Sequence, residues 1–174
     1  RLRRAPVLLE EPGRYASSFL RLRATVELAK AVNGGPVILV TSVSGGELES
    51  KSVTVANTGL ALARAGHRVV LVDLDLHHRS LAQVFRLAPE PGITDVLLGR
   101  STLDDALRQV GPYPDLEAAP RRWPRRRRSR AETLGYIRVG GALDVLTLGT
   151  VTANPADVVG TVGLAALDEH LRHR

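Results

Sequence analysis

The residues best suited to chemistry lie in a glycine-rich stretch that follows a short apolar run. Gly45, Lys51 and Ser52 fit the pattern G-x-x-x-x-G-K-[ST], and Ser50 stands where the second glycine belongs. In such a loop, backbone N–H groups point at phosphate oxygens, the lysine neutralises their charge, and the Ser hydroxyl ligates Mg²⁺. The stretch predicts a phosphate-binding loop. Its candidate residues are Gly45, Gly46, Glu47, Ser50, Lys51 and Ser52.

Two features of this stretch argue against phosphate binding. A serine in place of the second glycine crowds the phosphates, or costs about 1–2 kcal/mol if the position is left-handed. Glu47 and Glu49 place two negative charges beside an anion site. The alternative is a glycine-rich turn between a strand and a helix, with Lys51 as an ordinary solvated residue.

Two carboxylates follow a second apolar run. Asp73 and Asp75 come at the end of RVVLVD, residues 68–73. Strand alternation points both side chains the same way, and ligands of open α/β sheets bind at the carboxyl ends of the strands. With Lys51, they are the candidate catalytic residues, and with Ser52 they are candidate Mg²⁺ ligands. The alternative is a strand-end pair that caps the next helix.

The elements that position these residues follow from the apolar patterns. Residues 36–42 form a short, almost wholly apolar, β-branched run, which predicts a strand buried on both faces. The apolar positions of residues 53–63 have helical spacing, and Gly66 suits the end of that helix. With the strand at 68–73, they predict a βαβ unit with a right-handed crossover. Further helices are expected over residues 14–32, 79–86, 93–109 and 155–171, and a further strand over 143–148.

The charge of the chain is concentrated in one tract. The net charge is +6 over 174 residues, but the segment 121–130 holds seven arginines and no acid, which leaves the remainder at −1. This argues against nucleic-acid binding by the whole domain. The Pro- and Arg-rich residues 111–138 are expected to form a surface insertion, either simply solvated or binding anionic lipid or nucleic acid. There is no cysteine, which excludes disulfides and thiol catalysis.

A set of short motifs resembles a known family. TS at 41–42, KS at 51–52 and VDLDL at 72–76 resemble the ATPase domain of bacterial tyrosine kinases and polysaccharide chain-length regulators, within the MinD/ParA-like P-loop class. The segment 90–97 (EPGITDVL) and Asn154-Pro155 fit the same family. The loop departs from it in Ser50 and in two extra residues, Leu48 and Glu49.

The resemblance implies a fold, cofactors and partners. The fold is an α/β, three-layer α/β/α sandwich with a mainly parallel sheet, of the P-loop NTPase type. ATP and Mg²⁺ are the cofactors, and the activity is ATP hydrolysis or tyrosine autophosphorylation. The partner is a membrane-embedded polysaccharide co-polymerase module, in the same or a separate chain, at the cytoplasmic face of the plasma membrane. Homo-oligomers are compatible with this, and nucleic acid is disfavoured.

The expected domain organisation is a linker over residues 1–13 and a partial P-loop ATPase domain over 14–174. Three strands are few for a doubly wound sheet, so a truncated C-terminus and an inactive fragment are expected. The resemblance predicts an ATP-binding regulatory domain of capsule or exopolysaccharide biosynthesis. The alternatives are a degenerate, non-catalytic P-loop interaction module and a ParA/MinD-type partitioning ATPase.

Overall fold

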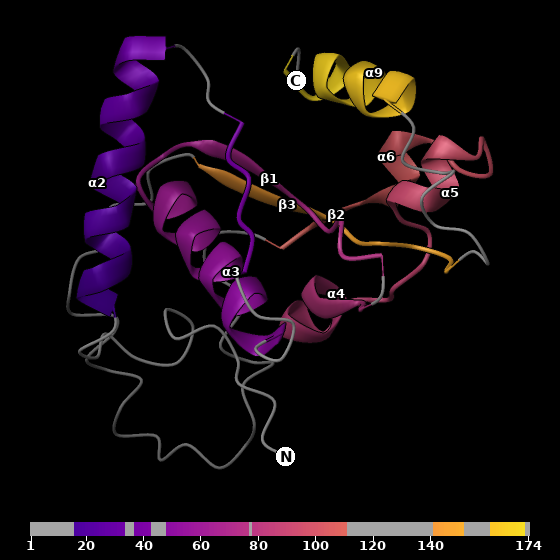
Figure 1. The fold of residues 1–174 in the computed structure, drawn as a ribbon, viewed down its shortest axis with the longest axis horizontal. Helices are drawn as coiled ribbons and strands as arrows, with labels where there is room; N and C mark the ends of the chain where they lie inside the picture. The colour runs from indigo at the N-terminus through magenta and orange to yellow at the C-terminus, as the bar shows by residue number, and fades with distance from the viewer. Residues whose placement is uncertain are drawn as a thin grey trace.

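The computed structural model describes residues 16–33, 37–42, 48–76, 78–110, 141–151 and 161–172 (Figure 1). The helices are α2 (Ala16–Asn33), α3 (Leu48–Arg64), α4 (Ser80–Phe85), α5 (Ile93–Leu97), α6 (Leu103–Ala106) and α9 (Thr161–Arg172). The strands are β1 (Arg68–Val72), β2 (Leu107–Gln109) and β3 (Ala142–Leu146). The predicted linker at 1–13, the insertion at 111–138, His77 and Asn154-Pro155 lie outside the described residues.

The described strands form one mixed sheet in the order β1-β3-β2. β1 and β3 are parallel, with Val69 opposite Leu143 and Val72 opposite Leu146. β2 is antiparallel to β3, with Gln109 opposite Asp144. The α/β class is confirmed, and the parallel part of the sheet is the β1–β3 pair.

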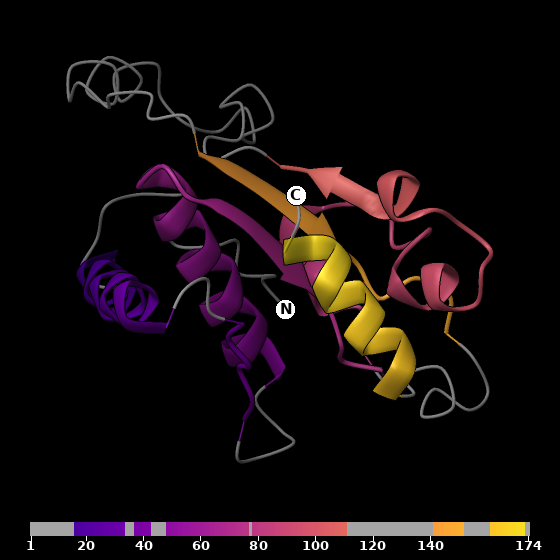
Figure 2. The same ribbon diagram turned by 90° about the horizontal axis from the view of Figure 1, so that it is seen from above.

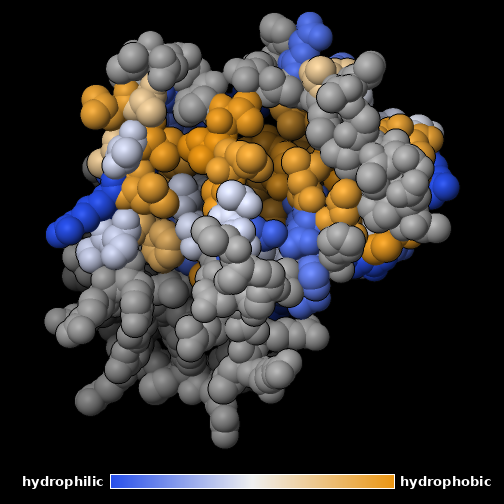
Figure 3. All heavy atoms as spheres, in the orientation of Figure 1, coloured by the Kyte–Doolittle hydropathy of each residue, from blue (hydrophilic) through white to orange (hydrophobic). Residues whose placement is uncertain are grey.

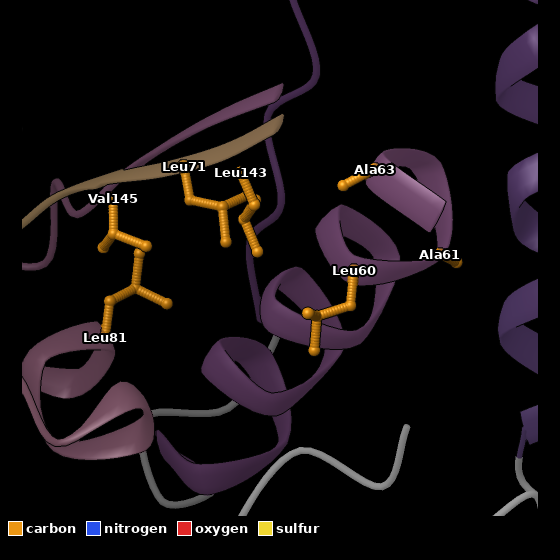
Figure 4. Close-up of a cluster of buried hydrophobic side chains, with 7 residues drawn as sticks. All are labelled: Leu60, Ala61, Ala63, Leu71, Leu81, Leu143 and Val145. Atoms are coloured by element: carbon orange, nitrogen blue, oxygen red, sulfur yellow. The ribbon is translucent and has the colours of Figure 1, made fainter. Parts of the chain in front are cut away.

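Both faces of β3 are buried, as the alternation of its side chains requires. Leu143 and Val145 face α3 and α4, where they join one apolar cluster (Figure 4). Leu146 and, beyond the strand, Leu148 face α5, α6 and α9 in a second cluster. Helices therefore cover both faces of the sheet, which makes the three layers seen in Figure 2.

The unit from α3 to β1 brings the start of a helix and the end of a strand to the same edge of the sheet. α3 lies so close to β1 that a Cβ on Gly59 would be 2.8 Å from Leu71 Cδ2. The helix ends at Arg64, and Gly66, the predicted C-terminal glycine, follows two residues later with a φ of 97°, which suits glycine. Because α3 turns directly into β1, its first turn, with Lys51, lies beside the segment after Val72.

The predicted strand at 36–42 is wrong for its described residues, 37–42. These residues form no strand, and Val37, Ile38 and Leu39 are 69%, 48% and 82% exposed. β1 and β2 occupy the two edges of β3, and the structure gives 37–42 no neighbouring strand within the described residues. An apolar run without cross-strand partners lacks the interactions that stabilise a strand. Figure 3, in the orientation of Figure 1, shows apolar residues gathered in the upper middle part of the face that it views.

The predicted helix at 93–109 is also wrong, because the segment divides into three elements. α5 ends before Gly99, whose φ is 67°. Thr102 begins α6, and its side chain accepts a hydrogen bond from the N–H of Asp105. The last three residues, 107–109, pair with β3 instead of continuing the helix. None of the helices in the described ranges is long and apolar enough to cross a membrane.

Candidate functional site

An ion pair joins the two sequence motifs at the edge of the sheet. Lys51, in the first turn of α3, donates from Nζ to Asp75 Oδ2 at 2.9 Å. The two side chains are 25% and 10% exposed, so water screens the pair only in part. The other oxygen, Asp75 Oδ1, lies 3.3 Å from Nδ1 of His78. Lys51 is therefore not the solvated residue of the alternative interpretation.

Asp73 has a different environment from Asp75. It is 4% exposed. Its Oδ2 accepts a hydrogen bond from the N–H of Leu81 at 3.0 Å, and its Oδ1 accepts one from the N–H of Asp75 at 3.2 Å. Burial, the largest influence, raises the pKa of Asp73 above its ordinary value, although these two hydrogen bonds and the Lys51 charge lower it in part. Asp73 thus satisfies one N–H in the first turn of α4, while Asp75 pairs with Lys51, so the alternative of a pair that caps the next helix applies to Asp73 alone.

Of the other predicted site residues, the structure describes Ser52 and the backbone of Ser50. Ser52 is buried, at 5% exposure, one residue after Lys51 on α3. Ser50 lies in the first turn of the same helix, while the position of its side chain is outside the described part of the structure. Gly45, Gly46 and Glu47 are outside it as well. The structure therefore brings together Lys51, Asp73 and Asp75, with Ser52 beside Lys51 in the chain.

The extra pair in the loop becomes part of the helix. α3 begins at Leu48, so Leu48 and Glu49 form its first turn together with Ser50. The N–H groups of a first turn have no partner inside the helix, whereas those further along do. The N–H groups of residues 48–50 thus have no partner inside α3, and Lys51 would contribute chiefly its side chain to an anion site.

The donor set fits Mg²⁺ accompanied by a phosphate. A Ser hydroxyl and one or two carboxylates are the hard oxygen donors that Mg²⁺ takes from a protein, with phosphate and water oxygens completing its octahedron. Within the described residues, no group of three or more His, Asp or Glu side chains could hold a metal alone. Mg²⁺ bound by Ser52 and Asp75 would therefore need water or phosphate oxygens to complete its coordination.

Two features of the described residues, one at the site and one at the start of α5, were not predicted from the sequence. One is His78 beside Asp75. The other is Asp95, 5% exposed, whose Oδ2 accepts hydrogen bonds from the N–H groups of Gly92 at 2.9 Å and Thr150 at 3.1 Å. Burial raises the pKa of Asp95, but hydrogen bonds from Thr150 and Gly92 and the charge of Arg100 outweigh it, so the pKa lies below its ordinary value. The Gly-x-x-Asp spacing at the start of a helix was the available signal.

Solved structures define the class of the fold. The structure of the BceF tyrosine kinase domain superposes with a TM-score of 0.69 at 24% identity, covering 97% of this chain and 56% of that chain. The fold is thus similar to that of the BceF tyrosine kinase domain. No family model matches the chain.

Curated relatives agree with this class. The tyrosine-protein kinase YwqD of Bacillus subtilis is 27% identical over 162 residues, which are 92% of this chain and 56% of that protein. The septum site-determining protein MinD of Synechocystis is 41% identical over 86 residues, 48% of this chain and 32% of that protein. The resemblance to bacterial tyrosine kinases and MinD-like ATPases is confirmed. The chain spans about half the length of YwqD and a third of MinD.

Proposed function

We propose that this chain is an ATP-binding regulatory domain of bacterial capsule or exopolysaccharide biosynthesis. The observation that carries the proposal is the approach of Lys51 to Asp75 at the edge where α3 begins and β1 ends. It joins the loop motif to the Asp-x-Asp motif at the edge where α/β sheets bind ligands. The similarity to YwqD over 92% of this chain supports the tyrosine kinase side of the MinD/ParA-like class.

Each residue has a defined part in this proposal. ATP supplies the phosphoryl group, and Mg²⁺ neutralises its charge. The Lys51 ammonium would contact the phosphates, for which Gly45, Gly46, Glu47 and Ser50 are the further candidate binding residues. The Ser52 hydroxyl and the Asp75 carboxylate hold the metal. Asp73 orders the segment that carries Asp75 through its hydrogen bonds with the N–H groups of Asp75 and Leu81, and it is the second candidate for the metal and the water or acceptor hydroxyl.

The partner and location belong to the same proposal. A membrane-embedded polysaccharide co-polymerase module would place the domain at the cytoplasmic face of the plasma membrane, and the 121–130 arginines would favour anionic headgroups there. In the full-length protein, tyrosine autophosphorylation is the activity that the similarity to tyrosine kinases favours.

A second candidate is a non-catalytic interaction module of the same fold. Ser50 at the second glycine position, and an α3 that begins as early as Leu48, favour it. The MinD similarity over 86 residues keeps a partitioning ATPase as a third candidate. Nucleotide binding separates the interaction module from the two ATPases.

Thermal unfolding with ATP·Mg²⁺ tests the main proposal. A ligand at a hundredfold excess over its Kd stabilises the native state by about 2.7 kcal/mol, which raises the Tm by roughly 5–10 °C for a domain of this size. Lys51→Ala should abolish the rise. Lys30→Ala, which removes the only other lysine, on the exposed end of α2, should leave it intact. A parent protein whose Tm stays flat to millimolar ATP·Mg²⁺ would favour the interaction module.

A further inference from the structure

In the structure of this chain, Lys51 pairs with Asp75. Its ammonium lies in the first turn of α3, where the helix dipole is unfavourable for a cation. The Asp75 carboxylate, 2.9 Å away, offsets that charge. In this structure, the Asp75 carboxylate therefore pairs with the same Lys51 ammonium that would bind a phosphate.

Asp75 is well held in this position. Its two oxygens face different groups: Oδ2 faces Lys51 at 2.9 Å, and Oδ1 faces His78 at 3.3 Å. Its own N–H donates to Asp73 Oδ1, which fixes the backbone. At 10% exposure, a carboxylate that lost Lys51 would remain largely buried and less well compensated. The contact is thus more than a surface ion pair.

We propose that Asp75 is an autoinhibitory group that competes with the phosphates of the nucleotide for Lys51, and that Mg²⁺ converts it from a competitor into a ligand. This rests on the proposed function, since it assigns a regulation to the same site. Without metal, a phosphate that approaches Lys51 meets the Asp75 carboxylate as a second anion and is repelled. With Mg²⁺, the same carboxylate binds the cation that the phosphates carry.

The proposal predicts that Asp75→Asn has opposite effects with and without the metal. In EDTA, Asp75→Asn should bind ADP about fivefold more tightly than the parent, equivalent to about 1 kcal/mol. With Mg²⁺, the same variant should bind ADP several-fold more weakly, because the metal loses a ligand. Titration calorimetry on the 174-residue chain measures both affinities.

Glu90→Gln is the matched control. Glu90 forms an ion pair of the same length, 2.9 Å, with Arg79, but it is 50% exposed. The substitution makes the same change in net charge and should leave both affinities within twofold of the parent. If Asp75→Asn binds metal-free ADP no more tightly than the parent, or if Glu90→Gln gives the same gain, the proposal is wrong.

A ligand-free double-mutant cycle separates this proposal from the proposed function. Lys51→Met and Asp75→Asn should each raise the unfolding equilibrium constant about fivefold, and the double variant no more than either alone. Additive effects would show that the pair is not formed and would overturn the autoinhibition while leaving nucleotide binding open. If the two substitutions are coupled but neither the parent nor Asp75→Asn binds ADP, the proposed function is wrong. The competition between Asp75 and the phosphates is then wrong as well.

Discussion

Asp95 connects the start of α5 to the segment that follows β3, so its removal should be costly. Its Oδ2 accepts two backbone hydrogen bonds, from Gly92 at 2.9 Å and from Thr150 at 3.1 Å. Hydrogen bonds to a charged group contribute about 1.5–3 kcal/mol each. Asp95→Ala should therefore lower the free energy of unfolding by about 3 kcal/mol, a large part of the 5–15 kcal/mol typical of a domain. Urea denaturation followed by circular dichroism measures the loss.

Asp105 provides a matched control for this substitution. It stands at the third position of α6, as Asp95 does in α5, and its N–H and carboxylate both contact Thr102. Because Asp105 is exposed, water replaces its lost contacts, and Asp105→Ala should cost less than about 1 kcal/mol. Equal effects of the two substitutions, or a change of less than about 0.5 kcal/mol for Asp95→Ala, would refute the role of burial.

The same carboxylate predicts a pH dependence of stability. The pKa of Asp95 is lower in the folded chain than its ordinary value. Its stabilisation is therefore complete above the unfolded-state pKa of about 4 and is lost as the pH falls through the lower folded-state pKa. Asp95→Asn should lose less stability than the parent on acidification from pH 7 to pH 3. A parallel loss in both proteins would contradict the assignment.

Urea denaturation should also distinguish three other parts of the chain. Leu39→Asp should change the free energy of unfolding by less than about 0.5 kcal/mol, because Leu39 is 82% exposed. Leu60→Ala, at a fully buried site, should cost about 2–5 kcal/mol. A large loss of stability for Leu39→Asp would show that Leu39 is buried after all, as the predicted strand at 36–42 requires. Gly141→Ala should cost about 1–3 kcal/mol, because its Cβ would collide with the Ala63 carbonyl oxygen; a neutral result would contradict that contact. Deleting 119–133 should leave the melting temperature unchanged, since the segment has no periodic apolar face; a fall of about ten degrees would show that it is structural.

The unit from α3 to β1 could be predicted from the sequence because its signals are local. The helical spacing of residues 53–63, the glycine at position 66 and the β-branched run at 68–72 act within a few residues of one another. The contact of Asp73 with the start of α4, one half of the expected strand-end pair, is also local and spans only eight residues.

The conformations of residues 37–42 and 107–109 and the contacts of the site could not be predicted, because they depend on partners distant in the chain. Residues 37–42 have the composition of a buried strand, but composition does not supply a neighbouring strand. The three residues of β2 are too few to distinguish from the end of a helix by periodicity, and only pairing with β3 decides their conformation. The Lys51–Asp75 pair spans 24 residues and the Asp95–Thr150 contact spans 55. Neither contact could be predicted from the sequence, because only the folded chain brings these residues together.

Calorimetric titration of ATP·Mg²⁺ into the 174-residue chain tests the central claim most directly, because it measures nucleotide binding without requiring turnover. The proposed function predicts saturable binding with one site per chain, no detectable binding for Lys51→Ala, and parental affinity for Lys30→Ala. Tighter binding by Ser50→Gly would follow from the restored backbone freedom beside the phosphates. The absence of binding by the parent at millimolar ATP·Mg²⁺, or equal binding by the parent and Lys51→Ala, would contradict the account.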